Sequence, residues 1–355
     1  MFGISTAWCS GRLNDGVELL SQISRTGLNH LEIDYRVSGE MLRQMRPHLM
    51  NGEFTVLSVH NYCPLPDGRS REEASRLFPL STFDADERRL AIRHSIRTVQ
   101  LAADLGASMV VFHLGRVEMT TNLDELKKLF LQEQIHSAPA EAWREARLAE
   151  RRNLAAPYMD AVLSTLDPIH EEACRLGVNI GAENRLRFNE IPFGDECEQI
   201  LSTFSGGRLR YWHDCGHAEI NHRLGFLDHE NDLLARHREH LAGFHLHDVL
   251  QLKDHLAPAQ GDLDFKMLKH YIGDTTINIL EIHPPATAEQ ILAGVEYLQG
   301  LGISRPLQAI ADHGKKRNQK SDRQRRPGLR TCAFTTTGPV PGFEHLSSGE
   351  ETVFF

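Results

Sequence analysis

The sequence predicts a parallel (β/α)8 barrel, the TIM-barrel fold class, and three observations support this. Short β-rich runs alternate with longer stretches of helical period, as in a parallel sheet with crossover helices. Eight such units fit into about 300 residues. The glycine-rich phosphate turn that follows the first strand of many doubly wound sheets is absent from the sequence. These observations together favour a closed barrel over an open sheet.

The expected strands are short, apolar and β-rich. In chain order they are Gly3–Trp8, His30–Asp34, Phe54–His60, Ser108–His113, Val178–Glu183, Leu209–Asp214, Gly243–His247 and Ile277–Ile282. Two of the segments between them are expected to form amphipathic helices, Glu87–Leu105 and Met159–Leu176. Each is followed by a glycine that acts as a helix stop.

Two regions depart from this repeat. Residues Thr120–Ala156 are too long for one connection and are rich in Glu, Arg, Leu and Ala, so we expect a helical insertion after strand four that covers the top of the barrel. The periodicity stops after about Leu301. We therefore expect a barrel over residues 1–303 and a basic, low-order extension over residues 304–355, with a nucleic-acid-binding tail as the alternative.

The composition is that of an ordinary globular protein, with 355 residues of which 41% are hydrophobic and 25% charged. No apolar run approaches the roughly 18 residues of a membrane span, and the first residues form no basic or long apolar leader. The six cysteines are scattered without a C-x-x-C pair. We expect a cytoplasmic protein without a membrane anchor, and we leave open whether it forms a homo-oligomer.

Charge is unevenly distributed along the chain. Residues 305–355 carry nine Lys or Arg against five acidic residues, which leaves a formal charge of about −13 before position 305. An acidic body repels phosphate backbones unless a metal or a local basic patch compensates. The charge pattern therefore disfavours nucleic acid as a partner.

Metal-ligand residue types gather where the expected strands end, which is where TIM barrels carry their chemistry. They are His60, His113, Glu183, Asp214, His217, His245, His247, Asp248, Glu281 and His283, with His255 shortly after strand seven. Imidazole and carboxylate suit Zn²⁺, Mn²⁺ or Fe²⁺. Buried carboxylates that converge at one barrel mouth repel one another, and a divalent cation resolves that repulsion.

Five motifs carry a resemblance to a known family. They are A-E-N-R at 182–185, D-C-G-H-A at 214–218, H-L-H-D at 245–248, D-H-L-A-P-A-Q-G-D-L-D-F at 254–265 and L-E-I-H at 280–283. With them, residues 1–303 resemble the xylose isomerase-like TIM-barrel superfamily. It includes sugar isomerases and epimerases, inosose and dehydroshikimate dehydratases, and the endonuclease IV type of apurinic endonuclease (AP endonuclease family 2).

In the isomerase and epimerase branch, the resemblance implies one divalent metal, such as Mn, Co, Mg or Zn, held by four residues. By position they are Glu183, Asp214, His245 and Glu281. We prefer His245 to His247 because the family ligand precedes an acidic residue by three positions, as His245 precedes Asp248. The alternative, His247, stays open.

The apurinic endonuclease branch has further metal ligands. His60, His113, His217 and His255 match those additions, so His60 and His113 are candidates for additional metal binding. The aspartate expected two residues before His255 is Lys253, which weakens the third metal site.

The resemblance implies that Glu183 and Glu281 move a proton at the carbon beside a metal-bound carbonyl, through an enediolate. We expect a metal-dependent isomerase or epimerase of carbohydrate metabolism that acts on a sugar, sugar acid or cyclitol. Dehydratase chemistry stays open, because it begins with the same proton abstraction. The alternatives are a multi-zinc hydrolase of apurinic sites and a non-catalytic barrel that binds a sugar or a protein.

Four further residues are candidates for binding the substrate: His217, Arg185, Trp8 and His255. Arg185 has a structural alternative, an ion pair with an acid near the strand end. Trp8 is expected to close strand one, either as a wall under a sugar ring or as a core aromatic. We expect Glu32, at the end of strand two, to be a buried hydrogen-bond acceptor rather than a catalyst.

Overall fold

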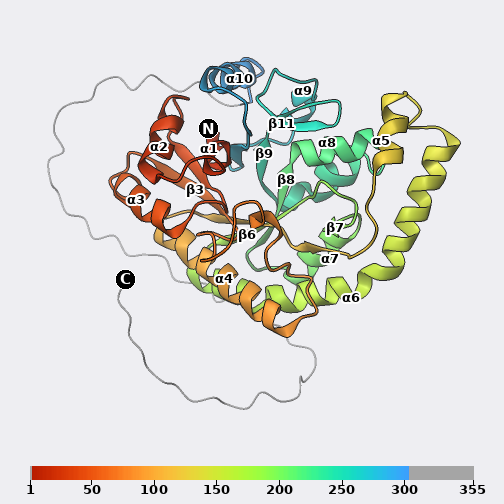
Figure 1. Ribbon diagram of the computed structural model, residues 1–355, viewed down its shortest axis with the longest axis horizontal. Helices are drawn as coiled ribbons and strands as arrows, with labels where there is room; N and C mark the ends of the chain where they lie inside the picture. Colours follow the sequence, from red (N-terminus) through yellow and green to blue (C-terminus); the bar gives the residue numbers. More distant parts are fainter. Residues whose placement is uncertain (1, 304–355) are drawn as a thin grey trace, which may run out of the picture. The chain divides into compact units, whose positions relative to one another are not determined.

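The computed structural model describes residues 2–303, and eight parallel strands at its centre close into a barrel (Figure 1). Around the barrel the order is β1-β12-β9-β8-β6-β4-β3-β2. Their bounds are β1 Phe2–Ser5, β2 His30–Ile33, β3 Thr55–His60, β4 Met109–Phe112, β6 Asn179–Glu183, β8 Leu209–Asp214, β9 Leu241–Leu246 and β12 Ile277–Leu280. The predicted fold class is confirmed. The predicted extension, residues 304–355, lies outside the described residues.

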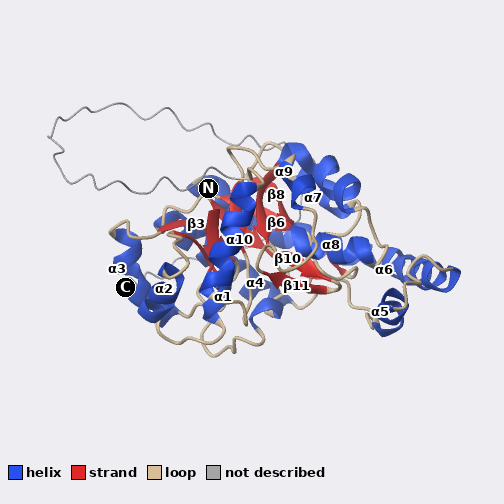
Figure 2. Cartoon of the chain, turned by 90° about the horizontal axis from the view of Figure 1, so that it is seen from above, coloured by secondary structure: helices blue, strands red, loops and turns tan. Residues whose placement is uncertain are grey.

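Helices surround the strands (Figure 2), and two small antiparallel ribbons extend the connections. The α-helices are α1 Ala7–Ser10, α2 Gly16–Ser24, α3 Gly39–Met50, α4 Ala85–Asp104, α5 Asp124–Leu131, α6 Ala138–Leu176, α7 Glu196–Thr203, α8 Cys215–Arg223, α9 Phe265–Lys269 and α10 Ala288–Gly300. The ribbons pair β5 Gly115–Arg116 with β7 Glu190–Ile191, and β10 Asp248–Leu250 with β11 Lys253–Leu256. Short helical turns are η1 Ala74–Arg76, η2 His229–Ala235 and η3 Arg238–His240. None of the described helices has the length and apolar character of a membrane span.

The first strand is shorter than predicted. It ends at Ser5, and the backbone turns into the right-handed helical region at Thr6. The Thr6 carbonyl then accepts from the N–H groups of Cys9 and Ser10. The prediction that Trp8 closes the strand is therefore wrong, because Trp8 lies in the one-turn helix α1.

The insertion after strand four is helical, as expected, but it is not a separate unit. Most of it forms α5 and the first half of α6, and α6 runs without interruption into the predicted helix Met159–Leu176. Figures 1 and 2 show α5 and the N-terminal part of α6 projecting to one side of the barrel. A small apolar cluster joins Leu126 and Ala140 of the insertion to Ile220 of α8 and Val249 of β10. The insertion thus packs on elements that follow the carboxyl ends of β8 and β9.

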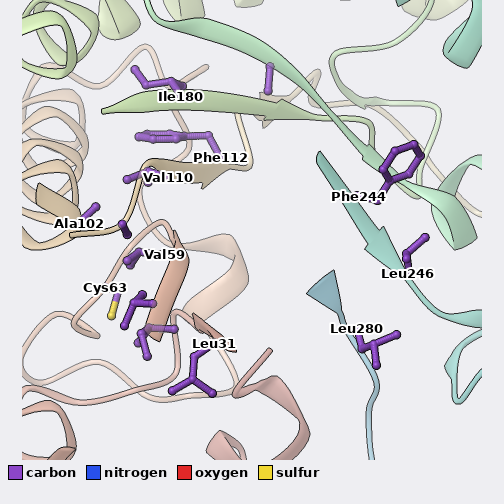
Figure 3. Packing of buried hydrophobic residues seen from close by; sticks show 14 of the residues in the cluster. Leu31, Val59, Cys63, Ala102, Val110, Phe112, Ile180, Phe244, Leu246 and Leu280 are labelled. Atoms are coloured by element: carbon purple, nitrogen blue, oxygen red, sulfur yellow. The ribbon is translucent and has the colours of Figure 1, made fainter. Parts of the chain in front are cut away.

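Successive side chains along a strand belong to two different apolar cores, one between the strands and the helices and one inside the barrel. Val110 and Phe112 of β4 belong to the large core shared with the helices (Figure 3), whereas Met109 and Val111 belong to a small cluster with Trp212. The small cluster contains buried residues of β4, β8 and β12 and plugs the barrel interior. Successive side chains point to opposite faces of a strand, so residues two positions apart share a face. The inward positions above this plug are therefore two residues further along the strand. They carry the polar residues of the candidate site.

A buried ion pair ties α6 to α7. Both terminal nitrogens of Arg151 donate to the Glu196 carboxylate, at 2.6 and 2.7 Å, and Nη2 also donates to the Glu190 carbonyl at 3.1 Å. The Arg151 and Glu196 side chains are 5% and 10% exposed. Removal of one partner would leave an uncompensated buried charge.

We expect Arg151→Met to lower the free energy of unfolding by about 3–5 kcal/mol, because Glu196 would lose its counter-charge in a buried position. Urea denaturation followed by circular dichroism would measure this. The neighbouring Arg152 is exposed, so Arg152→Met should change stability by no more than about 0.5 kcal/mol. Equal losses in the two variants would contradict the assigned role of the ion pair.

Candidate metal centre

Four buried side chains from four strands converge at the mouth of the barrel. Glu183 ends β6, Asp214 ends β8, His245 lies in β9, and Glu281 follows β12. One potential ligand atom of each lies within 4.8 Å of those of the other three. The structure thus brings together the four residues that the isomerase and epimerase branch implies. We call them the first group.

The imidazole of His245 has a definite orientation. Its Nε2 lies 3.0 and 3.1 Å from the two carboxylate oxygens of Glu32, so Nε2–H is the donor. Its Nδ1 makes no hydrogen bond with the described residues. This nitrogen nevertheless lies 3.0 Å from Glu281 Oε2, 3.5 Å from Glu183 Oε1 and 3.6 Å from Asp214 Oδ2. A buried ring nitrogen that faces three carboxylates fits a position where positive charge, as a proton or a bound cation, is held.

The charges of the first group support the same interpretation. Burial raises the pKa values of Glu183, Asp214 and Glu281. The cationic groups around them more than offset this, so all three pKa values lie well below their ordinary range. Burial lowers the pKa of His245, but Glu281 and Glu32 raise it well above the ordinary value. The site therefore holds three ionised carboxylates and attracts positive charge.

The D-C-G-H motif builds one side of the site. Asp214 caps α8, since its Oδ1 accepts from the His217 N–H at 2.7 Å. His247 Nδ1 accepts from the His255 N–H, so His247 Nε2 donates to Asp214 at 3.1 Å. A Cβ atom on Gly216 would lie 2.0 Å from the His247 ring, so glycine is required there. His247 thus contacts the first group through Asp214, whereas His245 is itself a member of the group. The preference for His245 as the ligand stays a prediction.

The A-E-N-R motif fixes the neighbouring strand end. The Asn184 amide oxygen accepts from the Asp214 N–H at 2.8 Å, and its nitrogen donates to the Asp214 carbonyl at 2.9 Å. These two bonds fix the end of β8 relative to β6. Asn184 is not among the predicted site residues, although its place between Glu183 and Arg185 in the A-E-N-R motif is a usable signal.

A second group shares Glu183. His60, His113 and Glu183 also offer ligand atoms within 4.8 Å of one another. Oε2 of Glu183 lies 3.0 Å from His113 Nε2 and 3.6 Å from His60 Nε2, and it accepts from Arg185 at 2.7 Å. Buried His60 Nε2 has no hydrogen-bond partner among the described residues. Burial and Arg185 lower the pKa of His113 to about 4, so this imidazole is neutral.

A third group corrects an expectation from the sequence. We expected Lys253 in place of an aspartate to weaken a third site, but Asp254 joins His217 and His255 within the same 4.8 Å limit. His255 has a left-handed backbone, with φ at 55°, which changes the direction of the chain beside Asp254. Asp254 Oδ2 is buried without a hydrogen bond to the described residues. Such a backbone turn at a non-glycine residue could not be read from spacing.

The other sequence candidates lie around these groups. Arg185 forms ion pairs with Glu183 at 2.7 Å and with Glu190 at 3.4 Å. These pairs fit the structural alternative for Arg185, an ion pair with an acid near the strand end. Trp8 is 3% exposed, and its indole N–H donates to the Ala286 carbonyl at 2.8 Å. Contact of these two residues with substrate stays a prediction. Glu32 accepts from Ser58 at 2.8 Å and holds His245, so it is the buried acceptor we expected.

The fold and these groups define a barrel with candidate metal-binding residues at its carboxyl-terminal mouth. The family model of the xylose isomerase-like TIM barrel matches residues 20–301, and the chain belongs to this family. No curated protein sequence matches the chain significantly.

Solved structures of similar fold include a D-tagatose 3-epimerase-like protein at 19% identity, with a TM-score of 0.56 and coverage of 84% of this chain and 96% of the other. A 3-keto-D-glucoside 4-epimerase from E. coli is 14% identical, with a TM-score of 0.58 and coverage of 84% and 98%. A Thermus thermophilus protein soaked with ZnCl2 is 20% identical, with a TM-score of 0.53 and coverage of 86% and 98%. At these identities the likeness establishes the fold.

Glu32→Gln should weaken the binding of Mn²⁺ by about 10- to 100-fold, because the carboxylate that orients a ligating imidazole also raises its basicity. Isothermal titration calorimetry of the metal-free protein would measure the affinity. Ser58→Ala removes only a hydrogen bond to Glu32 and should have a smaller effect. An unchanged affinity in Glu32→Gln would rule out this support of His245.

Proposed function

We propose that the chain is a divalent-metal-dependent isomerase or epimerase of a sugar, a sugar acid or a cyclitol. The observation that carries the proposal is the first group, in which three ionised carboxylates face the buried Nδ1 of His245. A donor set of carboxylates and one imidazole suits Mn²⁺, Co²⁺ or Mg²⁺. The sugar epimerases among the structures of similar fold support the same class.

Glu183, Asp214, His245 and Glu281 would hold the cation. It would act as a Lewis acid that stabilises the negative charge developing on a carbonyl oxygen when a proton leaves the adjacent carbon. The residues supply the proton transfer. Glu183 and Glu281 are both ionised, because the low pKa values keep them deprotonated at neutral pH, so each is competent to accept a proton.

The two glutamates come from strands on different sides of β8 and β9 in the barrel order, so they face the site from different directions. Glu281 would take the proton from one side of the substrate carbon and later release it to solvent. Glu183, after taking up a proton from solvent, would donate it from the other side, which inverts that carbon. Transfer by one glutamate to the neighbouring carbon would instead interconvert aldose and ketose. The proposal includes both outcomes.

The His113 side chain, 3.0 Å from Glu183, is 19% exposed. A small cavity of about 40 Å³ beside it is lined by polar residues that include Asn61, Arg116 and Glu190. Amide, guanidinium and carboxylate groups are suited to hydrogen bonds with hydroxyl groups. We propose that this cavity takes the end of the substrate that does not react.

Glu281→Gln should lower the rate of proton exchange by about 10²- to 10⁴-fold, because the amide cannot accept the proton. The measurement is NMR of deuterium incorporation beside the carbonyl, with a panel of ketoses and sugar acids in deuterated water and Mn²⁺ present. Exposed Glu296 on α10 offers a matched control, Glu296→Gln, which should remain fully active. Metal titration of both variants separates a lost base from a lost ligand. Full activity in Glu281→Gln would remove Glu281 from the mechanism.

The second and third groups favour one alternative, an apurinic-site phosphodiesterase with several zinc ions. These groups are rich in histidine, and Zn²⁺ prefers imidazole to a site made mainly of carboxylates. Against it, Arg185 already pairs with the Glu183 oxygen that faces His60 and His113.

Metal content of the purified protein should distinguish the two functions. We expect about one tightly bound divalent ion per chain, because Arg185 compensates the second oxygen of Glu183. Inductively coupled plasma mass spectrometry would measure this after dialysis. Two or three zinc ions per chain, together with nicking of abasic DNA, would establish the phosphodiesterase instead. Sugar binding without exchange or nicking would indicate the non-catalytic barrel.

A further inference from the structure

A second cavity, of about 390 Å³, lies between the β3–α4 connection and α4. It contains none of the residues of the three metal-type groups. Its lining includes Asp67, Arg69 and Phe78 from the connection, and Arg93, His94 and Arg97 from α4. A volume of this size is within the range of small-molecule sites. We call it the arginine pocket.

The arginine pocket carries exposed positive charge that no carboxylate of the described residues pairs with. It has three arginines against Asp67 alone, and no carboxylate of the described residues lies within ion-pair distance of Arg69, Arg93 or Arg97. Arg93 and Arg97 are four residues apart on one helix, and like charges at this spacing destabilise a helix. Elsewhere on α4, Arg89 pairs with Asp86. A bound anion would supply the counter-charge that the protein does not.

The wall of the pocket is built around Phe78. Its backbone is left-handed, with φ at 41°, which is unfavourable for a bulky residue. The buried Tyr62 hydroxyl donates to its carbonyl at 2.5 Å and holds this conformation. The Phe78 ring stacks on His94 at 5.3 Å, and the Arg69 guanidinium lies 5.2 Å from the ring centroid. The Arg69 guanidinium and the uncharged His94 ring are therefore placed by a fixed aromatic ring.

The field of the arginines reaches the histidine between them. Partial burial lowers the pKa of His94, and Arg93 and Arg97 lower it further. The guanidinium groups of Arg93 and Arg97 thus both lie close enough to His94 to disfavour its protonated form. The lining has three arginines against Asp67, a formal charge of about +2, although the chain as a whole carries a formal charge of −9.

We propose that the arginine pocket binds a small phosphorylated molecule, with Arg69, Arg93 and Arg97 as the ligands of its phosphate group. Guanidinium groups present paired N–H donors that match phosphate oxygens, and such charge-assisted bonds are among the strongest in proteins. The proposal goes beyond the proposed function and does not depend on it. The neighbours of Phe78 in the chain, Leu77 and Pro79, line the cavity beside His113. A ligand in the arginine pocket would therefore contact Phe78, in the segment that also lines the cavity beside His113.

The test is calorimetric titration of the full chain, loaded with Mn²⁺, with ribose 5-phosphate, inorganic phosphate and ribose. We expect saturable binding of ribose 5-phosphate that Arg97→Gln weakens by about tenfold, the loss typical of one charge-assisted bond. Arg89→Gln removes the same charge from the same helix outside the pocket and should leave the affinity unchanged. Equal affinity for inorganic phosphate would support recognition of the phosphate alone, and tighter binding of ribose 5-phosphate would support recognition of the whole molecule.

The variants isolate the pocket from the metal-type groups, because a ligand bound at the barrel mouth would not sense Arg97. Three results would overturn the proposal. These are an affinity for ribose 5-phosphate unchanged by Arg97→Gln, equal weakening by Arg89→Gln, and ribose binding that depends equally on Arg97. Binding of a single-stranded oligonucleotide that depends on Arg97, without binding of ribose 5-phosphate, would also overturn it in favour of a nucleic-acid contact. Thermal melting would verify that both variants fold.

Discussion

Electrostatic repulsion among Glu183, Asp214 and Glu281 is the constraint on which the rest of the barrel mouth depends. Each is almost completely buried, and each is ionised. Three negative charges cannot share a buried volume unless positive charge is supplied nearby. The protein supplies part of it from the rim, through Arg185 and the imidazoles. At the centre, His245 Nδ1 faces all three carboxylates and makes no hydrogen bond with the described residues, as a metal-ligating nitrogen would.

The barrel below the site provides rigidity. Trp212 fills the interior so tightly that a Cβ atom on Gly243 would lie 2.3 Å from its ring, and His245 packs against the same indole at 5.1 Å. Above this plug, Asn184 joins two strand ends and Asp214 caps α8, so the carboxylates are held by backbone as well as by side chains. Side chains on strands supported in this way are held in a fixed geometry.

Much of the site could be predicted from the sequence, because strand parity and strand ends determine which side chains point inward at the mouth. Glu183, Asp214, His245 and Glu281 each end or follow an apolar run, and such a run is visible without a structure. Features that depend on backbone conformation could not be predicted. The left-handed turn at His255 brings in Asp254, and the helical turn at Thr6 takes Trp8 out of β1.

Features that depend on contacts between distant parts of the chain could not be predicted from the sequence either. Arg69 and Arg97 are 28 positions apart, and only the fold brings them to one pocket. The continuity of α6 from Ala138 to Leu176 was also hidden, since two prolines lie inside it and proline commonly breaks or kinks a helix.

The most direct test of the central claim is an anomalous difference map from crystals of the protein grown with Mn²⁺. The account predicts a strong peak within bonding distance of carboxylate oxygens of Glu183, Asp214 and Glu281 and of His245 Nδ1. A map with no peak among these four residues, although manganese is bound elsewhere on the chain, would contradict it.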